Sequence, residues 1–474
     1  MNPVKYLFPV NRWLEPMFAA IILGSIIYAI WHLVTLAWLP QPFFYEPADM
    51  WGDWFNTSYW SRDPGTYDTY KTVYPPLSFV FLRLLTLDKC YPIANSAGDV
   101  GPGLAARSCD WLGVAALHTL FVINIIVVAL AFVKHDRKTA PWRSFAVAAG
   151  FPALEALDRG NLIIPTLTLV VVAYGPLTRS TWLRWLAIGL AVNLKVYVIA
   201  SIIPQLLRRR WRWVEGALIS VVAIYLAAYS ILGVGTPAEL VQNLSAFADS
   251  GASNLLDVWF PATFLALQAL LGNWQSPLMG LIGSYWVDFL LILLPALQHT
   301  VQAAIVMAAV LAWTRPEAVS RYRLTNLGIS LALITSESGG YSVILTFFFT
   351  MLEPWKGFGR KWAIVAVYLL CIPLDIPIDR APELVRDTFF PARTVITDYK
   401  IMIGPFIRPL FFYSIPFALS LVTMREVWDD YRNRGTTNRW RFRRDAWLFP
   451  GIKEPVRLET SPGGGPSSMK SHAS

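Results

Sequence analysis

The sequence predicts an all-α polytopic membrane protein with about 11–14 membrane segments and an outer loop after the first segment. Hydrophobic residues make up 55% of the 474 residues and charged residues only 15%, whereas a soluble chain carries about one quarter charged residues. Hydrophobic runs recur along almost the whole sequence, without the alternating segments of an outer-membrane barrel. The net charge of +9 lies beside these runs and in the tail. This distribution sets topology and attracts anionic lipid, and it does not indicate a nucleic-acid partner.

The N-terminal segment predicts the orientation of the chain. Lys5 and Arg12 precede the first hydrophobic run, at 17–39, so the positive-inside rule puts the N-terminus in the cytoplasm. The run is too long for a cleaved signal peptide and lacks a small-residue cleavage site, so we expect a signal anchor. Residues 40–110 then form the first outer loop. Within it, 74–87 is short for a span and is expected to lie on the outer leaflet or dip into it.

Two cysteines near the end of this loop are expected on the same side of the membrane. The next hydrophobic run, at 111–133, ends in a basic cluster at 134–138, which belongs inside. Cys90 and Cys109 therefore share the extracytoplasmic side, where a disulfide can form. It would close a loop of about 20 residues and contribute about 3 kcal/mol; two free thiols are the alternative. Cys371 lies in a later run and is expected only to pack.

Two short runs in the middle of the chain indicate a broken or re-entrant pair. The runs at 144–157 and 162–177 pass out and back. Those at 183–192 and 196–207 are each too short to cross about 30 Å at about 1.5 Å per residue. Non-helical backbone at membrane depth is tolerated where it lines a cavity. Lys195, between the two short runs, is therefore expected to point into one.

The remaining runs complete the predicted membrane domain, 1–425. They lie at 213–232, 324–335, 342–352, 362–372 and 401–423. Region 260–313 fits one long span with an interfacial helix or three shorter spans, with Pro295 and Gln298 expected to interrupt it. Residues 426–474 form a basic cytoplasmic tail, whose Gly/Pro/Ser-rich end from about residue 461 is expected to be disordered.

Three polar clusters fall at or near the predicted outer face. They consist of Asp49 with Asp53, of Asp158, Arg159 and Asn161 with Lys195, and of Ser336 with Glu337. Ionisable groups near bilayer depth cost about 2.5–3.5 kcal/mol each, which makes them candidates for function. The cations Arg159 and Lys195 suit a phosphate in a low-dielectric cleft. The carboxylates suit a general base that acts on a hydroxyl.

Each cluster also has a purely structural interpretation. Asp158 and Arg159 can form an internal ion pair at a helix end, and Lys195 can extend to an interface. Asp53 can be a solvated loop carboxylate, and Glu337 can cap a helix turn. Zinc spacing, a P-loop, a dinucleotide fingerprint and a Gly-x-Ser-x-Gly motif are absent from the sequence.

The order of these motifs resembles a known family of membrane enzymes. The sequence reads DWFN at 53–56 and VYPPL at 73–77, then DRGN at 158–161 and NLKVY at 193–197. This series resembles the polyprenol-phosphate-sugar-dependent glycosyltransferases of the GT-C superfamily, in particular the bacterial alpha-mannosyltransferase and arabinofuranosyltransferase family. The last two motifs also look like those of the eukaryotic first mannosyltransferase of GPI-anchor assembly. Many relatives carry a histidine-rich turn where this chain reads SESGGY at 336–341, so the role of those histidines is not carried over.

The resemblance implies a fold and a role for each matching residue. The fold would be a GT-C-type helical bundle, with its active site on the extracytoplasmic face of a bacterial inner membrane. Asp53 would act as the general base, assisted by Asp49. Arg159 and Lys195 would contact the donor phosphate. The side chains expected to shape the site are Asp158, Asn161, Tyr74 and Glu337.

The reaction implied is the transfer, with inversion, of one sugar from a polyprenyl-phosphate donor to a lipid or glycan acceptor, with mannose as the first choice. These substrates and membrane lipid are the expected partners, and nucleic acid is not. No cofactor is required, because protein cations can stabilise the departing lipid monophosphate; a divalent metal stays an open alternative. The alternative functions are a lipid-linked-glycan flippase or other transporter, which needs no base, and a glycan polymerase or ligase, which uses lipid-diphosphate oligosaccharides.

Overall fold

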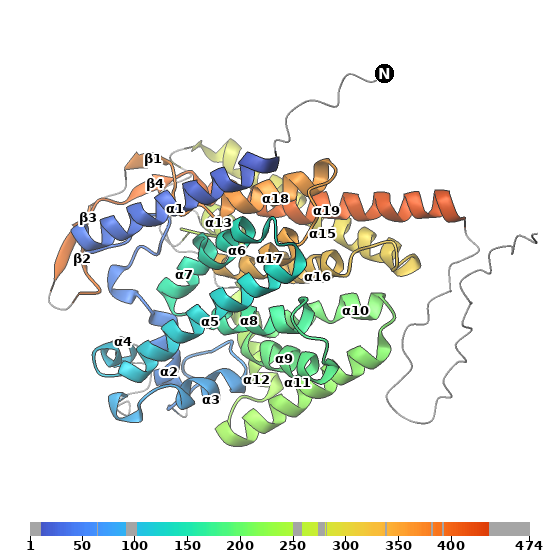
Figure 1. Ribbon diagram of the computed structural model, residues 1–474. Helices are drawn as coiled ribbons and strands as arrows, with labels where there is room; N and C mark the ends of the chain where they lie inside the picture. Colours follow the sequence, from blue (N-terminus) through green and yellow to red (C-terminus); the bar gives the residue numbers. More distant parts are fainter. Residues whose placement is uncertain are drawn as a thin grey trace, which may run out of the picture.

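Five long apolar helices set the architecture of the molecule (Figure 1). They are α1 (Asn11–Leu36), α5 (Trp111–His135), α11 (Trp211–Leu232), α15 (Ser284–Thr314) and α19 (Gly404–Arg434). Each has the length and composition to cross a membrane, for which about 20 apolar residues are needed. Their outer faces expose large apolar side chains, among them Ile27, Ile126 and Ile292. The protein is an all-α polytopic membrane protein, as the sequence predicted.

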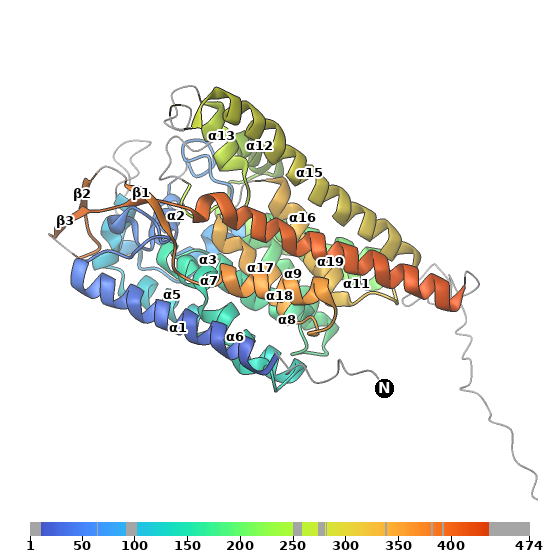
Figure 2. The same cartoon turned by 90° about the horizontal axis from the view of Figure 1, so that it is seen from above.

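The structure is a computed structural model that describes residues 11–63, 65–91, 102–249, 258–273, 280, 282–336, 339–380, 383–390 and 393–435. Shorter helices fill the space between the long ones (Figure 2). They are α6 (Ala140–Ala149), α7 (Phe151–Arg159), α8 (Ile163–Tyr174), α9 (Thr181–Leu194), η5 (Val196–Ser201), α10 (Ile203–Leu207), α16 (Arg321–Thr335), η7 (Gly340–Val343), α17 (Ile344–Met351) and α18 (Phe358–Leu370). Every residue of α17 is buried, so this helix lies in the core of the bundle.

The two ends of the bundle differ. At the end where α1 finishes, the structure gathers η2 (Pro47–Asp49), α2 (Gly52–Trp60), α3 (Pro76–Leu84), η3 (Asp88–Cys90), α4 (Pro102–Ala105), η4 (Ala106–Ser108), β1 (Pro377–Arg380), β2 (Leu384–Asp387), β3 (Thr394–Thr397) and β4 (Lys400–Met402). We call this the loop end, and the opposite end, where α19 finishes, the tail end. The helices α12 (Pro237–Asp249) and α13 (Leu265–Gly272) follow α11 in sequence. Asn243 of α12 donates hydrogen bonds to the Tyr67 and Thr72 carbonyl oxygens, which fixes α12 to the first loop.

The broken pair expected between 183 and 207 is present. Helix α9 ends at Leu194, Lys195 has an extended backbone, and η5 and α10 follow. A second break divides the predicted run 144–157 into α6 and α7 at Gly150. Pro152 follows this break in the first turn of α7, where a missing N–H costs no intrahelical bond. The N–H of Phe151, which lies in the first turn of α7 and has no partner within the helix, donates to the Cys371 carbonyl oxygen at 2.8 Å.

One expectation about the second half of the chain was wrong. Pro295 and Gln298 do not interrupt a helix, because α15 continues through both over 31 residues. Packing against α16 and α19 supports α15 across the missing proline hydrogen bond, and Gln298 donates to the Ile334 carbonyl oxygen of α16 at 2.9 Å. The segment between α18 and α19 contains two antiparallel strand pairs, β1 with β4 and β2 with β3.

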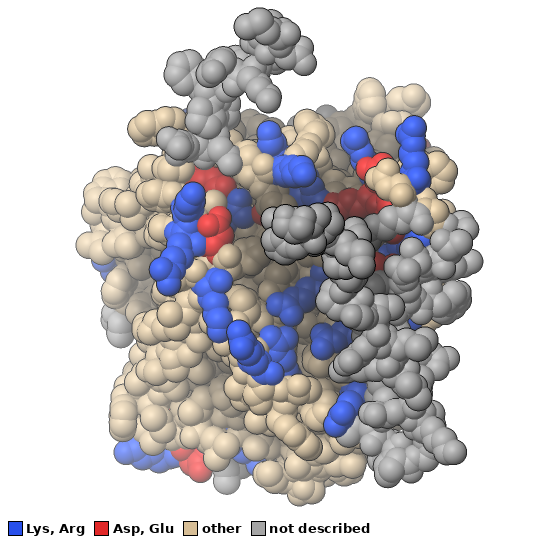
Figure 3. Space-filling model, turned by 45° about the vertical axis from the view of Figure 1, so that its right-hand side comes forward, with Lys and Arg blue, Asp and Glu red and all other residues tan. Residues whose placement is uncertain are grey.

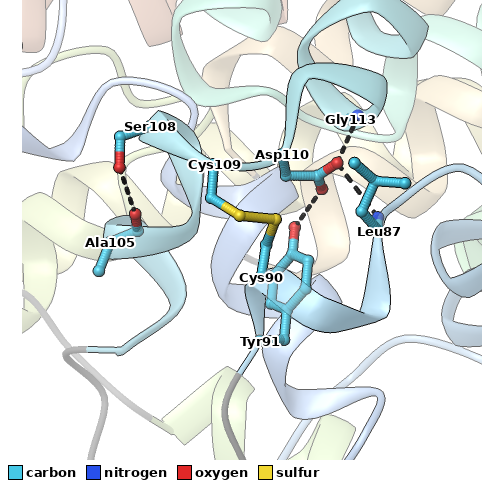
Figure 4. Close-up of a disulfide and its surroundings, with 8 residues drawn as sticks. All are labelled: Leu87, Cys90, Tyr91, Ala105, Ser108, Cys109, Asp110 and Gly113. Atoms are coloured by element: carbon cyan, nitrogen blue, oxygen red, sulfur yellow. Dashed lines mark hydrogen bonds between the residues drawn. A yellow bond between two sulfur atoms is a disulfide. The ribbon is translucent and has the colours of Figure 1, made fainter.

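Cys90 and Cys109 form a disulfide at the loop end, the pairing expected from the sequence (Figure 4). Asp110, next to Cys109, joins the same two segments of the chain through hydrogen bonds. Its carboxylate accepts hydrogen bonds from the Gly113 and Leu87 N–H groups and from the Tyr91 hydroxyl at 2.7 Å. Burial, with this hydrogen bond, raises the pKa of Tyr91, so the phenol remains the donor. The start of α5 is thereby tied to the end of the first loop.

We predict that replacing both disulfide cysteines with serine destabilises the protein by about 3 kcal/mol, because the bridge closes a loop of 19 residues in sequence separation. The apparent melting temperature of the protein, purified in detergent, should fall. Reductant should lower the melting temperature of the wild type to the value of the double variant and leave the double variant unchanged. Equal melting temperatures for wild type and double variant would contradict a stabilising bridge.

Candidate active site

The two carboxylates singled out in the first loop lie on a tight turn at the loop end. Asp49 ends η2 and Asp53 lies in the first turn of α2. Trp51 between them has a left-handed backbone, with φ of 64°, which reverses the chain. Its N–H donates to the Asp158 carbonyl oxygen at 2.5 Å, so the turn rests on the end of α7. The Asp49 and Asp53 side chains are partly buried, with exposed fractions of 23% and 22%.

Arg159 holds both carboxylates. Its Nη1 donates to Asp49 Oδ2 at 2.7 Å and its Nη2 contacts Asp53 Oδ1 at 3.2 Å. The guanidinium lies over the Phe44 ring, 4.1 Å from the ring centre, an arrangement in which arginine is attracted to an aromatic face. The structural alternative of an Asp158–Arg159 ion pair at a helix end does not describe this geometry. Arg159 instead joins α7 to the first loop, more than a hundred residues away in sequence.

The end of α7 requires glycine at position 160. Gly160 has φ of 67°. The Gly160 and Asn161 N–H groups bond back to Leu157 and Ala156, as in a Schellman C-cap. A Cβ atom at this position would lie 2.8 Å from the Trp54 Cβ. The absence of a side chain therefore permits both the left-handed turn and the close approach of α2, which brings Asp53 to Arg159.

Asn161 contacts the second oxygen of Asp53. Its Nδ2 donates to Asp53 Oδ2 at 2.5 Å and to the Tyr341 hydroxyl at 2.8 Å, and it lies 3.4 Å from the Tyr74 hydroxyl. Its Oδ1 accepts from the Ile163 N–H at 2.9 Å, which fixes the amide orientation at the start of α8. Asp53 is thus contacted from two sides, by an arginine and by an amide.

Lys195 lies beside this cluster with its side chain buried. Its Nζ is 4.4 Å from the centre of the Tyr74 ring, 5.7 Å from that of Tyr341, and 3.4 Å from the Tyr74 hydroxyl. It therefore points into the bundle and does not extend to an interface. Asp158 is also buried, and its backbone oxygen receives the Trp51 N–H, so it contributes to the position of the turn.

The structure brings together seven of the eight side chains expected in the site, namely Asp49, Asp53, Tyr74, Asp158, Arg159, Asn161 and Lys195. The eighth, Glu337, lies outside the described residues. From the same segment of the chain, the described side chain that reaches Asp53 is Tyr341, whose hydroxyl is 3.5 Å from Asp53 Oδ2.

Sequence reasoning also missed Arg107. Its Nη1 donates to the Ala48 and Met50 carbonyl oxygens, both at 2.7 Å, and thereby holds the turn that carries Asp49. Burial lowers the pKa of the Arg107 guanidinium, and Asp49 opposes this shift. The signal available in the sequence was its place two residues before Cys109, since the expected disulfide draws this segment to the first loop.

An apolar groove of about 540 Å³ begins next to the site. It lies between α15, α16 and the η5–α10 segment, and Leu324, Leu331 and Thr335 line it along one face of α16. From Leu324 to Thr335 this face extends about 16 Å. Next to the site, the groove is lined by Tyr197, which follows Lys195 by two residues. The Tyr197 hydroxyl donates a hydrogen bond to Ser342 Oγ at 2.9 Å.

Fold and site define an integral-membrane protein with carboxylates and buried cations gathered at one end of a helical bundle. A family model described as Glycosyltransferase family 87 matches residues 72–336, more than half of the sequence. The chain belongs to this family, and it is a membrane glycosyltransferase. The match includes Tyr74, Arg159 and Lys195 and begins after Asp53. Neither a curated protein nor a solved structure matches the chain.

We predict that Gly160→Ala destabilises the protein more than Gly233→Ala. Both glycines have left-handed backbones, but a Cβ at Gly233 would meet nothing within 4 Å. Gly233→Ala should therefore cost only the conformational penalty of about 1–2 kcal/mol, whereas Gly160→Ala must also separate α7 from α2. Thermal unfolding of the two variants in detergent measures the difference. Equal melting temperatures would mean that α2 can move away from α7 without lowering the free energy of unfolding.

Proposed function

We propose that this glycosyltransferase moves a single sugar from a polyprenyl-phosphate donor to a lipid or glycan acceptor, with Asp53 as the general base. The observation that carries the proposal is the position of the Asp53 carboxylate, which is partly exposed and lies between Arg159, Asn161 and the cluster around Lys195. A carboxylate that is fixed in place but reachable can receive the proton of an acceptor hydroxyl.

In the proposed reaction, the acceptor hydroxyl attacks the anomeric carbon as its proton passes to Asp53. The bond between the anomeric carbon and the phosphate oxygen breaks on the opposite side, so the configuration inverts. The phosphodiester, with one negative charge, becomes a lipid monophosphate that carries a second. Fixed cations near the leaving oxygen therefore stabilise the transition state more than the ground state.

Lys195 and Arg159 are the cations proposed for this role. The contacts of Lys195 with Tyr74 and Tyr341 are to neutral groups, so its charge remains available for a phosphate. Arg159 is already shared between Asp49 and Asp53. We therefore assign Lys195 the closer contact with the donor phosphate, and Arg159 the task of orienting Asp53 beside it.

The apolar groove supports a donor that carries a hydrocarbon chain. Its lining is almost entirely apolar and runs away from Tyr197 along α16. A polyprenyl tail in the groove would hold its phosphate near Lys195. Mannose as the transferred sugar rests on the resemblance of the motifs alone. Radiolabelled polyprenyl-phosphate mannose is therefore the first donor to test, followed by arabinose and galactose donors.

The charge distribution supports an extracytoplasmic site in a bacterial inner membrane. Lys and Arg side chains gather over the middle of the face that Figure 3 presents, which includes the tail end. Arg208, Arg315 and Arg321 belong to segments at that end. By the positive-inside rule the tail end faces the cytoplasm, and the loop end with Asp53 then faces outward.

Asp53→Asn should lower the transfer of label from polyprenyl-phosphate mannose to membrane lipid or glycan by about 10²–10⁴-fold, the usual contribution of a general base. Asp68→Asn, in the same loop but exposed, is the matched control and should keep wild-type activity. Transfer by Asp53→Asn at the wild-type rate would move the base elsewhere, with Asp49 the next residue to test. Movement of labelled lipid across vesicles, without transfer from any donor, would favour a transporter.

Ala309→Trp should impair use of the donor by filling the groove. Ala309 lines it from α15, whereas Ala303, six residues earlier on the same helix, is exposed and is not among the residues that line it. We expect Ala309→Trp to raise the KM for a long-chain donor about ten-fold, or about 1.4 kcal/mol, with little change in kcat. A short-chain donor should be affected less. Ala303→Trp is the control, and equal effects of the two variants would remove the groove from donor binding.

A further inference from the structure

Three arginines converge on a small pocket at the tail end, far from the candidate active site. Arg184 lies near the start of α9, Arg210 directly precedes α11, and Arg321 is the first residue of α16. All three line one pocket together with Gln205 and Tyr322, and all are partly buried. Among the described residues that line this pocket, none is acidic. Three separate elements thus direct positive charge into one place.

The contacts of Arg184 and Arg321 do not neutralise these two guanidinium groups. Arg184 donates to the carbonyl oxygens of Gly175 and Thr178, and Arg321 donates to the Tyr322 hydroxyl. These acceptors are neutral. Within the described part of the chain, neither Arg184 nor Arg321 forms an ion pair. Arg321 and Arg210 also repel the Arg184 guanidinium electrostatically. Such a cluster becomes favourable when an anion binds between its members.

Other arginines at the tail end show a different pattern. Arg143 pairs with Glu15 at 2.9 Å, and Arg323 pairs with Glu353 at 2.7 Å. Both are buried among helices and hold those helices together. At these two positions, the fold supplies a carboxylate to an arginine that joins helices. Positive charge needed only for topology can lie on the surface, as at Arg179, which is exposed.

The pocket is separate from the donor site and its groove. Helix α9 begins near Arg184 and ends at Lys195, and α16 runs from Arg321 to Thr335 beside the site. The 14 rises of α16 place the pocket about 20 Å from that end. On α16, Arg321 and Thr325 line the pocket, whereas Leu324 and Gly328 line the groove. A donor in the groove would therefore not reach these arginines.

We propose that this pocket binds the phosphate group of an anionic phospholipid in the leaflet at the tail end. Arginine recognises phosphate through paired N–H donors, and basic pockets between membrane helices bind anionic headgroups. The enclosed space of about 10 Å³ admits one water-sized group, such as a phosphate oxygen, with the rest of the headgroup at the mouth.

The test uses the full-length protein purified in a non-ionic detergent. Dioleoyl phosphatidylglycerol, dioleoyl phosphatidylcholine and inorganic phosphate are titrated separately, and the melting temperature is followed, because a ligand that binds the folded state raises it. The variants are Arg321→Gln, Arg184→Gln and the control Arg179→Gln, which lies outside the pocket. We expect phosphatidylglycerol to stabilise wild type and control alike. Arg321→Gln should weaken its apparent affinity about five-fold, the effect of one basic residue near an anionic lipid.

The outcomes separate the alternatives. Stabilisation by phosphatidylglycerol that depends on Arg321 and Arg184, and is not reproduced by phosphatidylcholine, supports the proposal. If inorganic phosphate stabilises equally and competes with the lipid, the ligand is a soluble phosphate and the lipid assignment is overturned. Equal responses of Arg321→Gln and Arg179→Gln overturn the site itself. Arg184 also holds the backbone of its loop, so if Arg184→Gln fails to fold, the comparison of Arg321→Gln with Arg179→Gln decides.

Discussion

The arrangement of the loop end depends on one arginine that serves two carboxylates. Arg159 lies at the end of α7 and reaches both Asp49 and Asp53, which belong to a turn more than a hundred residues earlier in sequence. A buried arginine without acidic partners would be costly in a membrane protein, and so would two adjacent carboxylates without a cation. Each side of the cluster therefore requires the other. The first loop is held against the bundle by charge, and Arg107 and the disulfide reinforce it from the adjoining segment.

The polar cluster is possible because two helices stop at the same end of the bundle. Helix α7 stops at Gly160 through a left-handed cap, and α9 stops at Leu194 before the extended Lys195. Each break leaves backbone N–H and C=O groups without helical partners and directs a polar side chain into the bundle. A continuous apolar helix would provide neither the free backbone groups nor the polar side chain. The backbone groups find partners locally, such as the Ile163 N–H on the Asn161 side chain. Breaks in short buried helices thus create polar surface within an apolar bundle, while the long helices α1, α5 and α15 face outward unbroken.

Much of the site could be predicted because charge at membrane depth is rare enough to be informative. Asp53, Arg159 and Lys195 were identifiable from topology, and the short runs around Lys195 indicated the break that turns it inward. Tyr341 was not identifiable, since tyrosine carries no charge and its contact with Asn161 joins residues 180 positions apart. The course of α15 through Pro295 depends on neighbours that the sequence does not reveal. The four strands are three or four residues long, too short for an alternating pattern to emerge. What was missed was decided by contacts distant in sequence.

Each end of the bundle contains arginines that are matched by carboxylates and buried or partly buried cations whose described contacts are neutral, and this distinction bears on function. At the loop end Arg159 is matched by carboxylates, which leaves Lys195 as the cation whose described contacts are neutral. At the tail end Arg143 and Arg323 are matched, and Arg184 and Arg321 contact neutral groups. An unmatched cation held in a pocket is maintained against an electrostatic cost, which a bound anion removes. The same reasoning underlies both proposals, a donor phosphate at Lys195 and a lipid phosphate at the arginine pocket. Under these proposals, the helices between the two sites fix their separation, so a lipid bound at the tail end would stabilise the helices that carry the site at the loop end.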